Sequence, residues 1–362
     1  MFSTIDKIET LRTAKAQAIL KLTPQLVDVL ESRKGPKGDA YEIARAAGIL
    51  AAKRTWEIIP YCHPIPIDHI AIDFLTDTTE VKITTTVSAV WKTGVEMEAL
   101  MAAQVAAITL FDMLKPMGAE MEITSVKVLE KMGGKTSFKE KIPQDFKVGI
   151  LVTSDGTFAG QREDRSGKII KERLEQFGIK NLDYQILPDD KQTIREKILK
   201  WCVEGYHLIL TTGGTGLGPR DVTSEATQEI IEREIPGIME AARSFGQDRT
   251  PYAMLSRGVA GLKGKALIVN LPGSSQGTKE SLDAIFPAIL HSYKMMAGEG
   301  HGENPKSEIR NWRKNDVYFS SNFFSYCLCL FHRGTCRRIF LSGGPCVDGT
   351  AARNARSTGF GL

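Results

Sequence analysis

The most constraining feature of the sequence is a glycine-rich segment at 211–223, TTGGTGLGPRDVT. An apolar run at 207–210 precedes it and a helix start follows it, so we predict a loop between a strand and a helix. Its glycines leave backbone N–H groups uncovered, and a phosphate can approach such groups closely. No Gly-Lys-Ser/Thr closes the segment, and the Gly-x-Gly-x-x-Gly spacing is also missing. We therefore predict an anion-binding loop of another kind; a turn that only caps a helix is the alternative.

Length and charge narrow the class of protein. The 362 residues have room for two domains, each with a sizeable core. Of the net charge of +4, residues 306–362 contribute +6, from nine Lys or Arg and three Asp or Glu, so residues 1–305 carry about −2. The part expected to fold therefore offers no electrostatic case for binding nucleic acid.

The sequence also indicates a cellular location. No basic segment followed by an apolar run opens the chain, so we expect no secretory signal. No stretch of about twenty apolar residues is found, so we expect no membrane span. Only Cys62 and Cys202 precede residue 306, which is too few for a disulfide framework and favours the reducing cytoplasm.

The region 1–140 mixes helical and strand patterns. Alternating apolar and polar residues predict strands, and longer periodic runs predict helices. The expected strands are 67–75, 81–90 and 123–129, and the expected helices are 39–58 and 95–114. This order predicts an α+β domain with an antiparallel sheet, helices on one face and a ferredoxin-like arrangement. Residues 141–146 are the expected linker.

In the region 147–305, apolar strands alternate with helices. The expected strands are 148–153, 183–187, 207–212 and 266–271, and the expected helices are 166–177, 192–203 and 277–296. This alternation predicts an α/β domain whose mostly parallel sheet is covered on both faces. Ligands of such sheets bind beyond the carboxyl ends of the strands, where 154–156, 189–190, 213–221 and 272–275 are expected to lie. Residues 306–362 show no periodicity, and we expect a disordered tail.

Charged residues recur in distinct blocks of the first region. The blocks are Lys-Gly-Asp at 37–39, Ala-Ala-Lys-Arg-Thr-Trp at 51–56, Cys-His-Pro at 62–64, Lys-Thr-Gly-Val-Glu-Met-Glu-Ala-Leu at 92–100 and Gly-Gly-Lys at 133–135. Structural explanations exist for single members: Thr93 and Glu96 can form a helix capping box, and Asp112 can pair with Lys115. Cys62 and His63 are adjacent on an extended segment and point to opposite faces, which argues against a nucleophile pair.

Together, in their order and spacing, these blocks resemble the cyclic pyranopterin monophosphate synthase (MoaC) family over residues 1–138. The resemblance implies conversion of a cyclised GTP derivative to cyclic pyranopterin monophosphate with loss of diphosphate. It implies a homo-oligomer, a hexamer or another multiple of three, with sites shared between subunits. The implied acid–base residues are Asp112, Lys115 and Lys131, and the implied substrate-binding residues are Lys37, His63, Glu96, Met97 and Glu98.

Residues 147 to about 300 resemble the MoaB/Mog family, on the glycine-rich segment and on the blocks at 187–190, 255–257 and 270–274. The resemblance implies transfer of AMP from ATP to molybdopterin. It implies Asp189 and Asp221 as catalytic residues and Mg²⁺ ligands. Helix N-capping is the alternative role for Asp221 and for the neighbouring Asp190. The implied phosphate-binding residues are Gly213, Gly214, Thr215, Gly216, Ser274 and Ser275.

Two functional hypotheses follow from these resemblances. The first is a bifunctional enzyme that carries out two steps of molybdenum cofactor synthesis, with the GTP derivative, molybdopterin and ATP as its small-molecule partners. The alternative is a synthase whose C-terminal domain only binds molybdopterin.

Overall fold

The computed structural model describes residues 1–134, 137, 140 and 142–298. The predicted tail at 306–362 lies outside the described residues, as does part of the predicted linker. Within the linker, residues 142–146 form neither helix nor strand. Residues 1–134 form the N-terminal part, and residues 142–298 form the C-terminal part.

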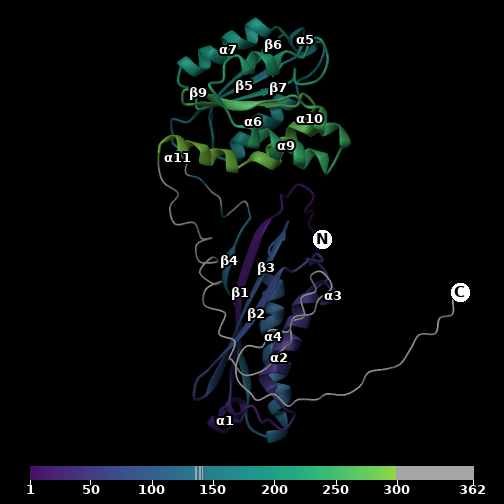
Figure 1. Cartoon of the computed structure of the whole chain (residues 1–362), viewed down its shortest axis with the longest axis vertical. Helices are drawn as coiled ribbons and strands as arrows, with labels where there is room; N and C mark the ends of the chain where they lie inside the picture. Colours follow the sequence, from purple (N-terminus) through teal and green to yellow (C-terminus); the bar gives the residue numbers. More distant parts are fainter. Residues whose placement is uncertain (135–136, 138–139, 141, 299–362) are drawn as a thin grey trace, which may run out of the picture. The chain divides into compact units, whose positions relative to one another are not determined.

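The N-terminal part contains a four-stranded antiparallel sheet with strand order β2-β3-β1-β4. Figure 1 shows its two long helices, α2 and α4, along one face of the sheet. In chain order the elements are β1 (Thr10–Lys21), α1 (Pro24–Ser32), α2 (Ala40–Lys53), α3 (Thr55–Ile58), β2 (His69–Thr76), β3 (Glu80–Trp91), α4 (Glu96–Leu114), the short 3₁₀ helix η1 (Lys115–Met117) and β4 (Glu122–Met132). The predicted α+β class and ferredoxin-like arrangement are confirmed.

Strand β1 was not among the predicted strands. It lies between β3 and β4, and Ala14, Ala16 and Ala18 on its inner face are at most 1% exposed. Alanine is a weak strand former, so this alternation carries little signal in the sequence. In the fold, the small side chains face a row of alanines on α4 that are also fully buried, including Ala99, Ala103 and Ala106. Small residues on both surfaces let the helix pack closely on the sheet.

Helix α4 is a long apolar segment, although the sequence was expected to contain no apolar stretch of about twenty residues. The segment Glu96–Met117 is long and apolar enough to cross a membrane by length and composition, with a mean hydropathy of 1.5. Half of its most apolar window is buried inside the protein, against β1, β3 and α2. Packing in the core accounts for this apolar composition.

The C-terminal part contains a six-stranded sheet with order β6-β5-β7-β10-β9-β8, in which the first four strands are parallel and β9 and β8 form an antiparallel edge. The elements are β5 (Lys147–Thr153), α5 (Asp155–Phe158), α6 (Ser166–Gln176), β6 (Asn181–Leu187), α7 (Lys191–Val203), β7 (Leu208–Thr212), α8 (Thr223–Gln228), β8 (Arg233–Glu234), α9 (Pro236–Gln247), η3 (Pro251–Leu255), β9 (Ala260–Lys263), β10 (Ala266–Leu271), α10 (Ser275–Ile285), η4 (Ala288–His291) and α11 (Ser292–Met296).

Helices cover both faces of this sheet, as predicted (Figure 1). Alternate residues of each central strand enter two different cores. Ile150 and Leu210 pack with α6, α9 and α10, whereas Leu151 and Ile209 pack with α7 and α8. The α/β class is therefore confirmed.

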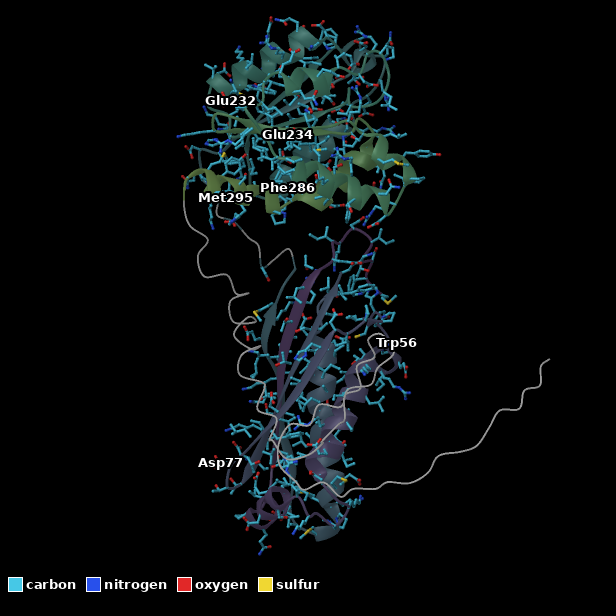
Figure 2. All side chains as sticks on the ribbon, viewed as in Figure 1. Trp56, Asp77, Glu232, Glu234, Phe286 and Met295 are labelled. Atoms are coloured by element: carbon cyan, nitrogen blue, oxygen red, sulfur yellow. The ribbon has the colours of Figure 1, made fainter. Side chains whose placement is uncertain are left out.

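The single helix predicted at 277–296 was wrong. Helix α10 ends at Ile285, and η4 and α11 follow as separate short helices. Pro287 causes this break, because proline lacks a backbone N–H and its ring clashes with a continuing helix. The preceding residue, Phe286, is extended and only 1% exposed, so it packs into the core at the break (Figure 2).

Candidate functional sites

The glycine-rich segment forms the predicted loop between β7 and α8. Gly213 and Gly214 have φ angles of 102° and 60°, in a region that favours glycine. A Cβ on Gly213 would lie 2.1 Å from the backbone oxygen of Thr153. Glycine at this position therefore lets the loop lie directly against the end of β5.

Buried hydroxyl groups hold the strand ends beneath this loop. Thr153 Oγ1 lies 2.9 Å from Thr223 Oγ1, which links β5 to the start of α8. The hydroxyls of Thr212 and Thr278 each donate to the backbone oxygen of Pro272 at 2.7 Å. Each of these threonines is at most 3% exposed. The loop thus rests on a fixed polar layer rather than on open solvent.

Arg257 holds the loop from its other side. Its backbone N–H donates to the Thr215 carbonyl at 3.0 Å. Its guanidinium donates to the carbonyls of Gly216 at 2.6 Å and Asp221 at 2.7 Å, and it pairs with Glu225. The sequence indicates no role for Arg257, because an arginine about 40 residues away along the chain gives no sign of the loop that it binds.

Asp189 and Asp221 line the same open cavity of about 580 Å³, at the carboxyl edge of the sheet. Asp221 Oδ2 accepts a hydrogen bond of 2.7 Å from Gly218 N–H. Asp189 Oδ2 accepts one of 3.0 Å from Asp155 N–H, and its buried Oδ1 has no hydrogen-bond partner within the described chain. Burial raises the pKa of Asp189, and the charges of Asp155 and Asp221 raise it further.

Helix N-capping was the alternative role for Asp221 and Asp190, and the structure shows it for only one of them. Helix α8 begins at Thr223 after Val222, without a side-chain cap, so the alternative role of Asp221 as an N-cap was wrong. Asp190 does cap α7, accepting from Thr193 N–H at 2.8 Å. The carboxylate of Asp221 is therefore directed to the glycine-rich loop, and that of Asp190 to its helix.

Only some of the predicted phosphate-binding residues line the cavity. Gly214 and Ser274 line it. Ser274 is exposed, but its hydroxyl also caps α10 by accepting from Gly277 N–H at 3.2 Å, and Ser275 is the first residue of that helix. Thr215 is 4% exposed, and its carbonyl is taken by Arg257.

In the N-terminal part, Lys37 and Asp112 form one cluster of predicted residues. Lys37 Nζ lies 2.7 Å from Asp112 Oδ2. This contact is the main reason that the pKa of Asp112 is lowered, and Lys115 contributes a smaller electrostatic effect. The ion-pair partner of Asp112 is thus Lys37 rather than Lys115, which begins η1 one turn later.

A second cluster lies at the opposite end of α4. Lys131 pairs with Glu96, the first residue of the helix. The two line a cavity of about 280 Å³ together with Arg12 and Lys92, cations that sequence analysis did not single out. The proposed Thr93–Glu96 capping box was wrong, because Val95 occupies the N-cap position and no side chain caps the helix.

Glu98 lies one position beyond half-exposed Met97 and is only 3% exposed. Burial raises its pKa to about 7, and the charge of Glu96 adds to the shift. Burial also raises the pKa of the Cys62 thiol, with a further contribution from Glu98. A raised pKa opposes thiolate formation, so Cys62 is not set up as a nucleophile. His63 Nε2 lies 2.8 Å from the Phe2 carbonyl oxygen.

The two N-terminal clusters cannot meet within one chain. Glu96 and Asp112 are 16 residues apart on one continuous helix, which corresponds to about 24 Å at about 1.5 Å per residue. The structure therefore brings Lys37 together with Asp112, and Glu96 together with Lys131. It does not bring Asp112 and Lys115 to Lys131.

Known proteins resemble both parts of the chain. Residues 1–134 match the MoaC family, and residues 149–291 match a family described as "Probable molybdopterin binding domain". A molybdenum cofactor biosynthesis bifunctional protein of Chlorobaculum tepidum is 39% identical over 295 residues, which cover 82% of this chain and 94% of the relative.

Two further relatives each resemble one part. A cyclic pyranopterin monophosphate synthase of Aquifex aeolicus is 39% identical over 150 residues, 41% of this chain and 59% of the relative. A molybdopterin adenylyltransferase of Helicobacter pylori is 38% identical over 167 residues, 45% of this chain and 95% of the relative. The chain belongs to the family of molybdenum cofactor biosynthesis bifunctional proteins, with a MoaC part followed by a molybdopterin-binding part.

Proposed function

We propose that the chain catalyses two separate reactions of molybdenum cofactor synthesis. The N-terminal part converts the cyclised GTP derivative to cyclic pyranopterin monophosphate and diphosphate. The C-terminal part transfers the adenylyl group of ATP to molybdopterin. The names of the relatives support this assignment, and the two separate charged sites support it physically.

The first reaction needs cations, because a triphosphate brings three to four negative charges. Lys37, Lys115, Lys131 and His63 supply positive charge or hydrogen-bond donors for it, and lysine suits this role as a compact point charge. A ring hydroxyl attacks the phosphorus nearest the sugar, its proton passes to a base, and diphosphate leaves. Cations near the leaving oxygens stabilise the charge that develops there.

Asp112 and Lys115 are the proposed acid–base pair of this reaction. The Lys37 ammonium keeps Asp112 ionised, so the carboxylate can accept a proton and return it when the ring closes. Lys131 is the proposed third member. Its ion-pair partner Glu96 lies about 24 Å from Asp112 along α4, so a second copy of the chain has to supply the lysine. We therefore propose a homo-oligomer in which neighbouring copies complete each synthase site, consistent with a multiple of three.

For the second reaction, the terminal phosphate of molybdopterin attacks the α-phosphorus of ATP, and diphosphate leaves. The N–H groups of Gly214 and Gly216, with Ser274 and Ser275, are proposed to hold the pterin phosphate, whereas the N–H of Gly213 donates to the Leu271 carbonyl at 3.4 Å. Asp189 and Asp221 are the proposed Mg²⁺ ligands, because magnesium selects carboxylate oxygens and binds through one or two of them. The buried, unpartnered Oδ1 of Asp189 fits this role. When bound, Mg²⁺ would neutralise phosphate charge.

The proposed location is the cytoplasm. The proposal rests on the small number of cysteines before residue 306, which are Cys62 and Cys202.

The observation that carries the second activity is the meeting of Asp189 and Asp221 at one cavity. The test incubates the full chain with molybdopterin, ATP and Mg²⁺ and measures diphosphate. Asp189→Asn and Asp221→Asn should each lower its release by on the order of 100-fold. Asp190→Asn is the matched control, because asparagine also caps helices well. If the wild-type chain binds molybdopterin but releases no diphosphate, the C-terminal part is only a binding module.

A further inference from the structure

Asp155 and Arg220 form an ion pair that neither family resemblance singled out. Arg220 Nε lies 3.1 Å from Asp155 Oδ2, and Arg220 Nη2 lies 3.0 Å from Asp155 Oδ1. This bidentate geometry is the most directional contact available to a carboxylate and a guanidinium. It links the loop after β5 to the glycine-rich loop after β7, which approach the cavity from two different strands.

The same Asp155 is joined to Asp189 by two reciprocal hydrogen bonds. Asp155 N–H donates to Asp189 Oδ2 at 3.0 Å, and Asp189 N–H donates to Asp155 Oδ1 at 3.0 Å. One oxygen of Asp189 is thereby fixed on a backbone amide. The other oxygen, Oδ1, is buried and left without a hydrogen-bond partner in the described chain.

The position of Arg220 extends this arrangement to the second proposed metal ligand. Arg220 directly precedes Asp221, whose carbonyl is held by Arg257 and whose Oδ2 is held by Gly218 N–H. The ion pair of Arg220 therefore tethers the glycine-rich loop to Asp155 at the position next to Asp221. The resulting chain of bonds runs from Asp189 through Asp155 and Arg220 to Asp221.

Stability alone does not account for this pair. The side chains of Arg220 and Asp155 are 64% and 47% exposed, and ion pairs at such positions contribute little to the free energy of folding. Contacts around metal ligands act differently, because they orient the ligand oxygens before the ion arrives.

We propose that Asp155 and Arg220 are positioning residues, which hold Oδ2 of the Asp189 carboxylate so that its Oδ1 would be left to bind the divalent metal ion of adenylyl transfer. This inference rests on the proposed function of the C-terminal part. Neither residue is assigned a contact with the reacting phosphates. Their effect on the reaction passes through Asp189 and Asp221.

The first test measures binding of Mn²⁺ alone to the full chain by electron paramagnetic resonance, without nucleotide or pterin. The relevant site is the component of binding that Asp189→Asn removes. Asp155→Asn keeps an oxygen that can accept from Asp189 N–H but loses the charge and the second acceptor of the bidentate pair, and Arg220→Gln removes the cation. Both should raise the Mn²⁺ dissociation constant of this site about 10-fold. Their melting temperatures should stay within about 2 °C of the wild type.

Glu232→Gln is the matched control. Glu232 also bonds a cation, Lys263 at 2.9 Å, and a backbone amide, Gly264 N–H at 3.0 Å. It lies beside the antiparallel edge of the sheet, where its N–H bonds the carbonyl of Leu262 (Figure 2). This control should leave the Mn²⁺ affinity unchanged.

A second measurement distinguishes a positioning role of Asp155 from a general loss of structure at the site. If Asp155 acts through metal binding, the adenylyl-transfer rate of Asp155→Asn should recover towards wild type as the Mg²⁺ concentration rises. Arg220→Lys, which keeps the charge, should lie between wild type and Arg220→Gln in Mn²⁺ affinity.

The inference is overturned if the wild type has no Mn²⁺ component that depends on Asp189, or if Asp155→Asn and Arg220→Gln bind Mn²⁺ as tightly as wild type. It is also overturned if Glu232→Gln weakens the site equally. Failure of the proposed function looks different: the wild-type chain then releases no diphosphate, whatever its affinity for Mn²⁺.

Discussion

Lys37 binds Asp112 twice, through the carboxylate at 2.7 Å and through the backbone carbonyl at 2.9 Å. The carbonyl lies near the C-terminal end of α4, where the helix dipole favours a positive charge. The two contacts fix the ammonium group over the last turn of the helix. Lys37 comes from the segment before α2, so this contact also joins two separate stretches of the chain at the proposed site.

Replacing either member of this pair should abolish the synthase reaction and spare the fold. Asp112→Ala removes the proposed acid–base group, and acid–base catalysis typically contributes about 10²–10⁴-fold to a rate. Both side chains are substantially exposed, so the melting temperature should change little. The measurement is formation of cyclic pyranopterin monophosphate, together with thermal unfolding. Lys37→Met should behave similarly, and Lys82→Met, which breaks the partly exposed pair with Glu80, is its control. Soluble Asp112→Ala protein with normal turnover would remove Asp112 from the mechanism.

Two inactive variants should restore activity when they assemble together. Asp112→Ala and Lys131→Ala damage clusters at opposite ends of α4, about 24 Å apart. If neighbouring copies complete each site, mixed particles contain some sites with both groups intact. The variants are unfolded, mixed, refolded and assayed, and mixing is verified by native mass spectrometry. Mixed particles as inactive as the separate variants would contradict shared sites.

Protonation of Glu98 should make stability depend on pH. Its folded pKa of about 7 exceeds the ordinary value of 4.5, so the folded state holds a proton that the unfolded chain releases between these values. The free energy of unfolding therefore falls as pH rises from about 4.5 to about 7, by up to about 3 kcal/mol. Glu98→Gln cannot ionise and lacks this dependence.

The stability of Glu98→Gln relative to wild type should accordingly be greater at pH 8 than at pH 5. Urea denaturation at the two pH values measures it. A difference between variant and wild type that is the same at both values would show that Glu98 does not hold a proton in the folded state.

Asn270→Leu should destabilise the C-terminal part. The buried Asn270 amide donates to Thr211 Oγ1 at 2.8 Å and Thr227 Oγ1 at 2.9 Å, and its oxygen accepts from Val259 N–H at 3.2 Å. Leucine fills similar space but leaves these buried groups without their partner, at a cost of at least about 2 kcal/mol. Chemical denaturation measures the loss. The exposed Asn181 is the control, and an Asn270→Leu variant as stable as Asn181→Leu would contradict the assigned role.

Local signals in the sequence predicted most of the fold of the C-terminal part and the loops that carry its proposed site. Apolar strand runs between helical patterns, with glycines after β7, are signals of short range, and they placed Asp189 and Asp221 at one edge. Features that depend on packing partners were missed. The alanines of β1 make sense only against those of α4, and Arg257 only against the loop it binds.

Caps and helix ends were predicted less well than whole elements. Thr93 and Asp221 have side chains suited to capping, but the helices begin later, at Glu96 and Thr223, and Glu96 pairs with Lys131 instead. At the first position Glu96 is held by the distant Lys131, and at the second the Asp221 carboxylate is held by the nearby Gly218 N–H. The proposed cooperation of Asp112 with Lys131 would depend on a second copy of the chain, which no pattern in one sequence describes.

Helix α4 carries half of one proposed synthase centre at each end, and this arrangement has a genetic consequence. A polypeptide that is damaged at both ends of α4 but still folds would join intact ones and contribute a faulty half to each of two centres. Cells that express both forms should therefore lose more synthase output than the share of damaged polypeptide alone would remove.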